Sequence, residues 1–153
     1  MPALITPQGV LTEVPAILAY IAQTHPEQNF APTDPFVFAK AQEFNAYICS
    51  TVHVAHAHRH RGPRWSDDPS TYKSMQAKVP DNLTECARVI EAHYFQGPWV
   101  MGNQYSMCDP YLFLATRWME SDGVDIEAFQ KIKAHRDLML TRPATQKIMA
   151  LHP

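Results

Sequence analysis

The first twenty-five residues alternate short apolar runs with turn residues, and they predict two strands followed by a helix. Residues 1–6 and 10–12 are the two apolar runs, and Pro7-Gln8-Gly9 between them has turn chemistry. From Glu13 onward, apolar side chains recur at helical spacing, at Ala16, Ile17, Tyr20 and Ile21. Because a two-stranded ribbon is only marginally stable alone, the segment is expected to need further partners.

Residues 26–32 contain two prolines and show no periodicity, so they are expected to separate a first unit, residues 1–25, from a second, residues 33–153. The second unit opens on Asp34-Pro35, an N-cap followed by proline at the first helical position. A long helix is predicted from there down to Gly62. Its apolar stripe consists of Val37, Ala41, Phe44, Ile48, Val52 and Ala55.

The rest of the second unit also has helical patterns. Asp68-Pro69 repeats the cap-and-proline signature and opens a second long helix toward Gln96-Gly97, which Pro80 is expected to kink or divide. Ser106-Met107-Cys108-Asp109 is a capping box with Asp in the fourth place. Residues 111–119 are apolar on nearly every side and predict a central helix. Another helix is predicted from Asp125, and a short last one after Arg142-Pro143. The chain is therefore expected to be mainly α.

Composition narrows the class of protein. The chain has 153 residues, 46% hydrophobic and 18% charged, enough to bury a core. A net charge of −2 with both signs mixed argues against a general nucleic-acid binder or a membrane-surface binder, and no apolar run is long enough to span a bilayer. Three cysteines, Cys49, Cys86 and Cys108, form no CxxC pair. They indicate reduced thiols in a reducing compartment. A cytoplasmic location is expected because the sequence shows neither a basic N-terminal region with an apolar core nor a membrane-spanning run.

A histidine cluster is the most conspicuous candidate for chemistry: His53, His56, His58 and His60. His56 and His60 lie four apart on one helical face, which suits a divalent metal. No acid or cysteine adjoins them in the sequence, so we favour a solvated helix end whose cations suit the helix C-terminus, and we assign no metal site. His53 lies further up the helix, where a ligand-facing role and an interior role both remain open.

Other candidates favour structural roles. Aromatic residues at helical spacing more often form core than pockets, although these are able to line an apolar pocket: Trp65, Trp99, Trp118, Tyr94 and Tyr111. Asp109 belongs to the capping box, which favours a structural role over catalysis. Cys108 precedes it on a buried helix and is expected to be inert.

Several motifs together resemble the soluble glutathione transferases over nearly the whole chain. The opening run of residues 2–20 is similar to the second half of the family's thioredoxin-like domain, on the residues Pro2-Ala3-Leu4, Gly9, Leu11-Thr12-Glu13, Ala16-Ile17 and Tyr20. The capping box at Ser106 falls where the family places one, and Arg142-Pro143 is similar to its tail. The bacterial beta-like branch is most similar, because its helix matches at Glu43-Phe44, Tyr47-Ile48 and His53, although Val54 replaces its usual lysine.

This resemblance implies an all-helical glutathione-transferase C-terminal domain preceded by the β-β-α remnant of a thioredoxin-like domain. It implies glutathione as co-substrate, with Pro2 as the cis-proline before the strand and the Met1 backbone pairing with the cysteinyl part. Glu13 would meet the α-amino group of the γ-glutamyl end. Val14 stands where the family usually has a serine whose hydroxyl binds the carboxylate of the γ-glutamyl end. The backbone N–H at the start of the helix is then left to bind that carboxylate. His53 becomes the candidate catalytic residue.

The resemblance also implies a function and an assembly. The family conjugates glutathione to an apolar electrophile, usually as a homodimer with the first long helices near the two-fold axis. The family's earlier strands, with the Tyr, Ser or Cys that polarises the thiol, have no counterpart here, and Met1 is expected to stand where a Val codon served as an alternative start. Weak or no activity is therefore expected of this shortened chain. The alternative is a non-catalytic helical interaction or ligand-binding module.

Overall fold

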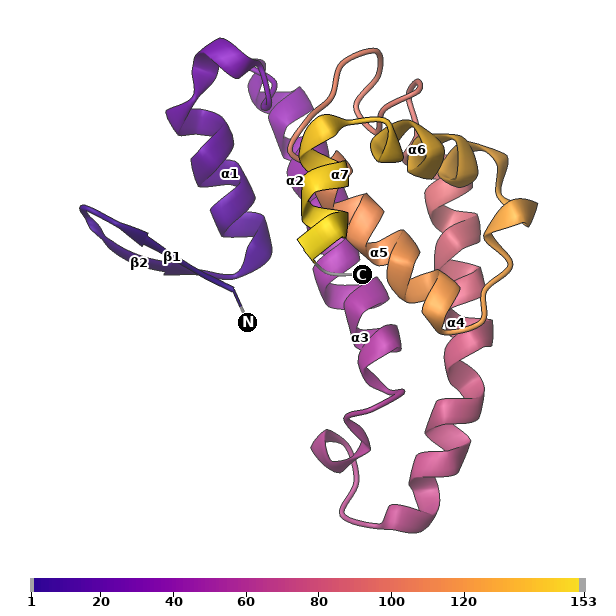
Figure 1. The fold of residues 1–153 in the computed structure, drawn as a ribbon. Helices are drawn as coiled ribbons and strands as arrows, with labels where there is room; N and C mark the ends of the chain where they lie inside the picture. The colour runs from indigo at the N-terminus through magenta and orange to yellow at the C-terminus, as the bar shows by residue number, and fades with distance from the viewer. Residues whose placement is uncertain (1, 152–153) are drawn as a thin grey trace.

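A β-hairpin and one helix stand at one side of a bundle of helices in the computed structural model, which describes residues 2–151 (Figure 1). Strands β1 (Ala3–Thr6) and β2 (Gly9–Thr12) pair antiparallel, with Ile5 opposite Val10. The Thr6 hydroxyl donates to the Gly9 carbonyl at 2.8 Å and closes the turn. Gly9 has φ +138, which side-chain-bearing residues rarely adopt. The predicted strand–turn–strand is confirmed, and its Ile5–Val10 face is exposed.

Helix α1 (Val14–Thr24) follows the hairpin, and Glu13 is its N-cap rather than its first helical residue. The 3-10 turn η1 (Pro26–Gln28) comes next, and Asn29 closes it in the left-handed conformation. Residues 26–32 thus connect α1 to the bundle, as the prolines predicted. The division into units at 1–25 and 33–153 stays a prediction.

The first long helix contains a π-helical turn that the sequence did not predict. It consists of α2 (Pro35–Tyr47), the π turn η2 (Ile48–Val52) and α3 (His53–Ala57). As predicted, Asp34 caps it, accepting from the Phe36 and Val37 amides, each at 2.9 Å. The His53 N–H donates to the Ile48 carbonyl. Ile48 and Val52, at the two ends of the π turn, are both fully buried.

Two 3-10 turns, η3 (Gly62–Arg64) and η4 (Pro69–Thr71), lead into α4 (Tyr72–His93). Asp68 caps η4, accepting from the Ser70 amide at 2.8 Å. Pro80 lies inside α4 and does not divide it, and a kink, the other predicted outcome, stays a prediction. The fully buried Val79 and Leu83 hold the flanking turns against the core, and this burial outweighs the hydrogen bond that proline cannot make.

Helix α5 (Asp109–Ser121) lies in the middle of the bundle, between α3 and α4 and below α6 (Gln130–Leu140) in Figure 1. The predicted start of α6 at Asp125 is instead the 3-10 turn η5 (Ile126–Ala128), and α7 (Pro143–Leu151) ends the described chain. The core contains the fully buried Phe44, Ile48, Leu83, Ile90, Leu112, Met119 and Ile132. Although α5 is apolar on nearly every side, Leu114 is 40% exposed, which contradicts a helix covered all round.

The predicted fold class is confirmed: a mainly helical chain with a small two-stranded sheet ahead of the bundle. Within residues 2–151, no helix combines the length and the apolar character needed to cross a membrane.

Candidate functional site

A cavity of about 310 Å³ lies where the start of α1 meets the helices of the bundle. It brings together Pro2, Glu13 and Val14 from the first segment and His53 from the long helix, the residues that the sequence singled out. Its full lining is Pro2, Glu13, Val14, Cys49, His53, Arg61, Tyr111, Leu114 and Trp118. Acidic, basic and apolar side chains thus share one space.

Glu13 holds an unusual backbone conformation at this cavity. Its φ of 68° and ψ of 121° lie in a region that residues with side chains seldom adopt, at a cost of about 1–3 kcal/mol. The Glu13 side chain accepts no hydrogen bond from the first amides of α1, so its carboxylate is available to a ligand. Strain retained beside a cavity suits a residue held in place for a ligand.

The start of α1 offers a second polar feature. Val14 has no side-chain hydroxyl, but amides in the first turn of a helix have no intrahelical acceptor. With the positive end of the helix dipole, they form a natural anion site. The roles predicted for the Met1 backbone and for a cis bond before Pro2 lie outside the described residues.

His53 is half-buried and lines the cavity with its ring against Trp118, the two centroids 4.9 Å apart. Burial lowers the pKa of His53 below its usual 6.5, and the positive charges of Arg61, His56 and Arg64 lower it further, whereas Glu13 opposes them. A neutral imidazole is therefore present at pH 7. In that form it is able to accept a proton from a bound acid.

Helix α5 supplies the wall of the cavity. Burial raises the pKa of Tyr111 to about 12, with smaller contributions from Cys49 and Glu13, so the phenol keeps its proton and remains a donor. Leu114 and Trp118 add apolar surface. Burial, and then the charge of Glu13, raises the pKa of the Cys49 thiol.

The lining also contains Cys49, Leu114 and Arg61, which no sequence pattern singled out. Cys49 lies four residues before His53, so its helical spacing was an available signal. Arg61 carried no such signal, because its approach to the cavity depends on the turn after α3.

His56 makes a contact that overturns the solvated-helix-end interpretation. Its Nδ1 lies 2.6 Å from Oδ2 of Asp122, a carboxylate 1% exposed at the end of α5. Arg59 Nε lies 3.3 Å from Oδ1 of the same residue. The His56 ring also stacks on Trp118 at 4.9 Å with 6° between planes. An acid therefore adjoins the cluster in space, and no group of three candidate metal ligands occurs in the part of the chain that the structure describes.

Asp109 has the structural role that its capping box predicted. Its Oδ2 accepts from the Ser106 amide at 2.6 Å and from the Ser106 hydroxyl at 2.9 Å. Its Oδ1 accepts from the Val100 amide at 2.9 Å and lies 3.0 Å from Nε2 of the buried His135. Burial, then the charge of Asp109, raises the pKa of Cys108 to about 12, which makes that thiol inert.

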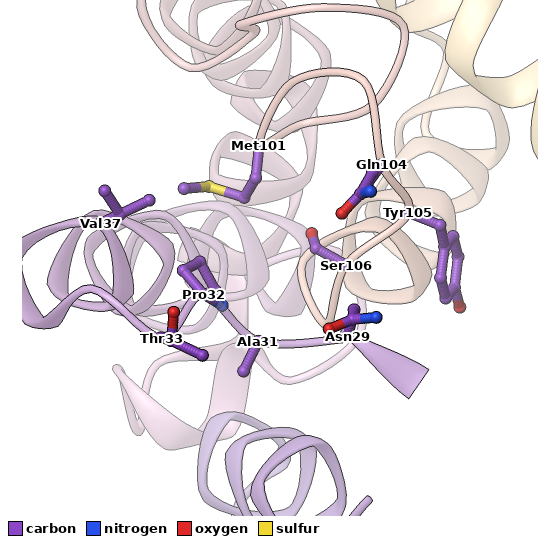
Figure 2. A pocket seen from close by; sticks show the side chains of 9 residues that line it. All are labelled: Asn29, Ala31, Pro32, Thr33, Val37, Met101, Gln104, Tyr105 and Ser106. Atoms are coloured by element: carbon purple, nitrogen blue, oxygen red, sulfur yellow. The ribbon is translucent and has the colours of Figure 1, made fainter. Parts of the chain in front are cut away.

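A second cavity, of about 280 Å³, lies between residues 29–33 and residues 101–106 (Figure 2). Figure 2 shows Met101 and Gln104 on one side of it, with Pro32 and Thr33 on the other. The residues that line it include no acid, base or cysteine, and Tyr105 is the titratable one among them. The hydroxyls of Thr33, Tyr105 and Ser106 have no base among the lining residues to activate them, so the first cavity is the better candidate.

The aromatic residues divide between the two roles weighed from the sequence. Trp118 and Tyr111 line the first cavity. The other three pack against neighbours: Trp99 on Tyr105 and His135, Tyr94 on Phe44 and Tyr47, and Trp65 on His58.

A β-β-α unit beside a helical bundle, with a polar cavity where they meet, matches the second half of the thioredoxin-like domain and the helical domain of the glutathione transferases. A glutathione transferase homolog from Sulfitobacter, solved with bound glutathione, has a TM-score of 0.93 to this chain at 38% identity, covering 98% of this chain and 81% of that one. The chain belongs to the bacterial glutathione transferase family.

Other relatives agree. Glutathione S-transferase GstA of Escherichia coli O157:H7 is 28% identical over 153 residues, 98% of this chain and 72% of that protein. The beta class glutathione S-transferase of Sphingomonas chungbukensis has a TM-score of 0.81 at 25% identity, covering 96% of this chain and 71% of that one. No protein-family model matches the chain.

Proposed function

We propose that the cavity between α1 and the bundle binds glutathione, and that the protein conjugates glutathione to an apolar electrophile. The observation that carries this proposal is the meeting of Pro2, Glu13, Val14 and His53 around one cavity. The bound glutathione of the Sulfitobacter homolog supports the ligand.

Each part of the tripeptide has a proposed partner. The Glu13 carboxylate pairs with the α-amino group of the γ-glutamyl end. The Val14 amide N–H donates to the carboxylate of that end, with the help of the helix dipole. The cysteinyl part pairs with the Met1 backbone, next to Pro2. The proposed place of the thiol is beside His53, which lines the same cavity.

The proposed chemistry is attack by a thiolate, because the thiolate rather than the thiol is the nucleophile. Neutral His53 accepts the thiol proton, and the sulfur forms a bond to an electrophilic carbon. In a substitution, the leaving group departs with its electron pair and His53 returns its proton to solvent. In an addition, the carbanion that forms takes up a proton instead. The apolar wall at Leu114 and Trp118 holds the electrophile. We expect slow turnover by the chain itself, because only His53 among the lining residues is suited to take this proton.

Binding to immobilised glutathione, followed by calorimetry, tests the ligand. Glu13→Gln should weaken binding about tenfold, since it removes a charge-assisted hydrogen bond. Glu27→Gln is the matched control, because Glu27 is an exposed carboxylate on η1 away from the cavity, and it should bind as the wild type does. A chlorinated nitroaromatic then measures conjugation. Wild-type protein that is not retained on glutathione would refute the proposal.

The alternative function is a non-catalytic ligand-binding module. An apolar groove of about 460 Å³ along α5 and α7 favours it, lined among others by Phe113, Leu114, Met139, Ile148 and Met149. Binding of an apolar dye that glutathione does not displace, together with no retention on glutathione, would support this alternative.

A homodimer in the cytoplasm completes the proposal. A groove lies between the first long helix and α4. Tyr47 and Val54 line it from the long helix, which is expected near the two-fold axis, and Glu85 and Cys86 line it from α4. Val54→Glu should lower the mass measured by sedimentation to that of one chain. Val37→Glu is the control, since Val37 is equally exposed but lies outside this groove. The free thiols of Cys49, Cys86 and Cys108 suit a reducing compartment.

A further inference from the structure

Arg61 is the cationic side chain in the lining of the proposed glutathione cavity whose charge is permanent. The same lining holds the Glu13 carboxylate, the neutral His53 and apolar wall residues. The charge of Arg61 reaches the ring of His53, where it is the largest electrostatic cause of that residue's lowered pKa. A ligand bound in this cavity therefore lies near the positive charge of the Arg61 guanidinium.

Within residues 2–151, the Arg61 guanidinium forms no ion pair with an acidic side chain. Two other arginines of the chain contrast with it. Arg59 is paired with Asp122, and Arg136 with Glu120, Glu127 and Asp137. Arg61 is exposed and retains its hydrogen-bond donors.

The backbone that carries Arg61 is fixed. Its amide donates to the Ala57 carbonyl at 2.9 Å, and its carbonyl accepts from the Arg64 amide at 2.9 Å. The next residue, Gly62, is buried so tightly that an added Cβ would lie 2.6 Å from the Tyr72 ring. Arg61 therefore extends from a rigid base at the cavity rather than from a loose loop.

We propose that Arg61 is a carboxylate-binding residue of this cavity, a role that rests on the proposed glutathione site. A guanidinium matches a carboxylate with two parallel N–H···O bonds, which gives orientation as well as affinity. The carboxylate belongs either to the glycyl end of glutathione or to an acidic group on the electrophile. In the second case, the protein selects electrophiles that are apolar with one acidic end.

Calorimetry with two ligand pairs tests the proposal and separates these sources. The first pair is glutathione and its glycyl ethyl ester; the second is 4-chloro-3-nitrobenzoate and the corresponding benzamide. Arg61→Gln should weaken binding of the acid at least about tenfold in one pair, and leave the uncharged partner unchanged. Arg61→Lys should recover part of the loss, since it keeps the charge but not the fork.

Arg64→Gln is the matched control. The charge of Arg64 lowers the pKa of His53, but Arg64 does not line the cavity. The Arg64→Gln variant should therefore bind both acids as the wild type does. Thermal unfolding checks that each variant is folded. Little change in the unfolding temperature is expected, because an exposed side chain contributes little to stability.

The outcomes separate the two proposals. Wild-type binding of glutathione with no effect of Arg61→Gln on either acid would refute the role of Arg61 and leave the glutathione site standing. Binding of the benzoate but not of glutathione, with loss in Arg61→Gln, would support Arg61 and refute the glutathione site. Binding of neither acid by the wild type would refute both.

Discussion

His56 Nδ1 lies 2.6 Å from Oδ2 of Asp122, and the same imidazole stacks on Trp118, a wall residue of the proposed glutathione cavity. This contact ties α3 to the end of α5. Because His53 also packs on Trp118, the indole is held between α3 and the cavity by two histidine rings.

Asp122→Ala should lower the free energy of unfolding by about 3 kcal/mol, because it leaves His56 and Arg59 without the buried carboxylate that they share. Urea unfolding measures the loss. Asp125→Ala is the control, since Asp125 is exposed and caps only a short 3-10 turn, so about 1 kcal/mol or less is expected. Equal losses in the two variants would contradict a special role for Asp122.

Asp109→Ala should be more damaging than Ser106→Ala. The carboxylate accepts hydrogen bonds from three groups on Val100 and Ser106 and contacts His135, all in a buried setting. Its loss should cost at least about 3 kcal/mol, whereas loss of the serine hydroxyl should cost about 1 kcal/mol. Thermal unfolding should show a fall of roughly 6–12 °C for the first variant, and several degrees less for the second. Similar falls would mean that the capping box alone accounts for Asp109.

Val14→Ser should raise the affinity for glutathione. A hydroxyl at the start of α1 adds a donor beside the amide proposed to hold the γ-glutamyl carboxylate, and a hydrogen bond to a charged group supports a gain of about tenfold. Calorimetry measures it, with Val10→Ser as control, because Val10 is on the exposed face of the hairpin. No gain at Val14 would place the carboxylate elsewhere.

Thiol alkylation at pH 8 should be slow at Cys108, whose pKa of about 12 leaves only about one thiolate in ten thousand. Cys49 lines the cavity and is less buried, so it should react first among the three cysteines. S-methylglutathione, which has no thiol, should slow alkylation of Cys49 but not of the other two. Mass spectrometry of the labelled peptides tests both statements; protection of Cys86 instead would move the ligand to another site.

His53 should titrate below 6.5, and Arg61→Gln should raise its pKa because a nearby positive charge is removed. Since the folded pKa lies below the unfolded value, the unfolded chain binds more protons as pH falls through about 6.5. His53 therefore makes the fold less stable on acidification across this window, and His53→Gln should lose that component. NMR of the ring protons follows the titration, and a midpoint above 6.5 would contradict the prediction.

Local patterns in the sequence determined the features that depend on a few consecutive residues. The Asp34 and Asp68 caps form as predicted because each side chain bonds to amides two or three residues away. The hairpin turn at Pro7-Gln8 and the Ser106–Asp109 box follow from the same short range. The resemblance to the family singled out three residues of the first segment as candidates for glutathione binding: Pro2, Glu13 and Val14.

Tertiary packing decided the features that join distant parts of the chain. The intact α4 across Pro80 depends on burial of Val79 and Leu83 against the rest of the bundle, and the π turn before His53 has no signal in the apolar periodicity. Asp122 reaches His56 only because α5 packs against α3, and Arg61 reaches the cavity only because Gly62 packs on Tyr72. Caps and turns are settled by hydrogen bonds within a few residues, whereas the composition of a cavity is settled by how whole helices pack.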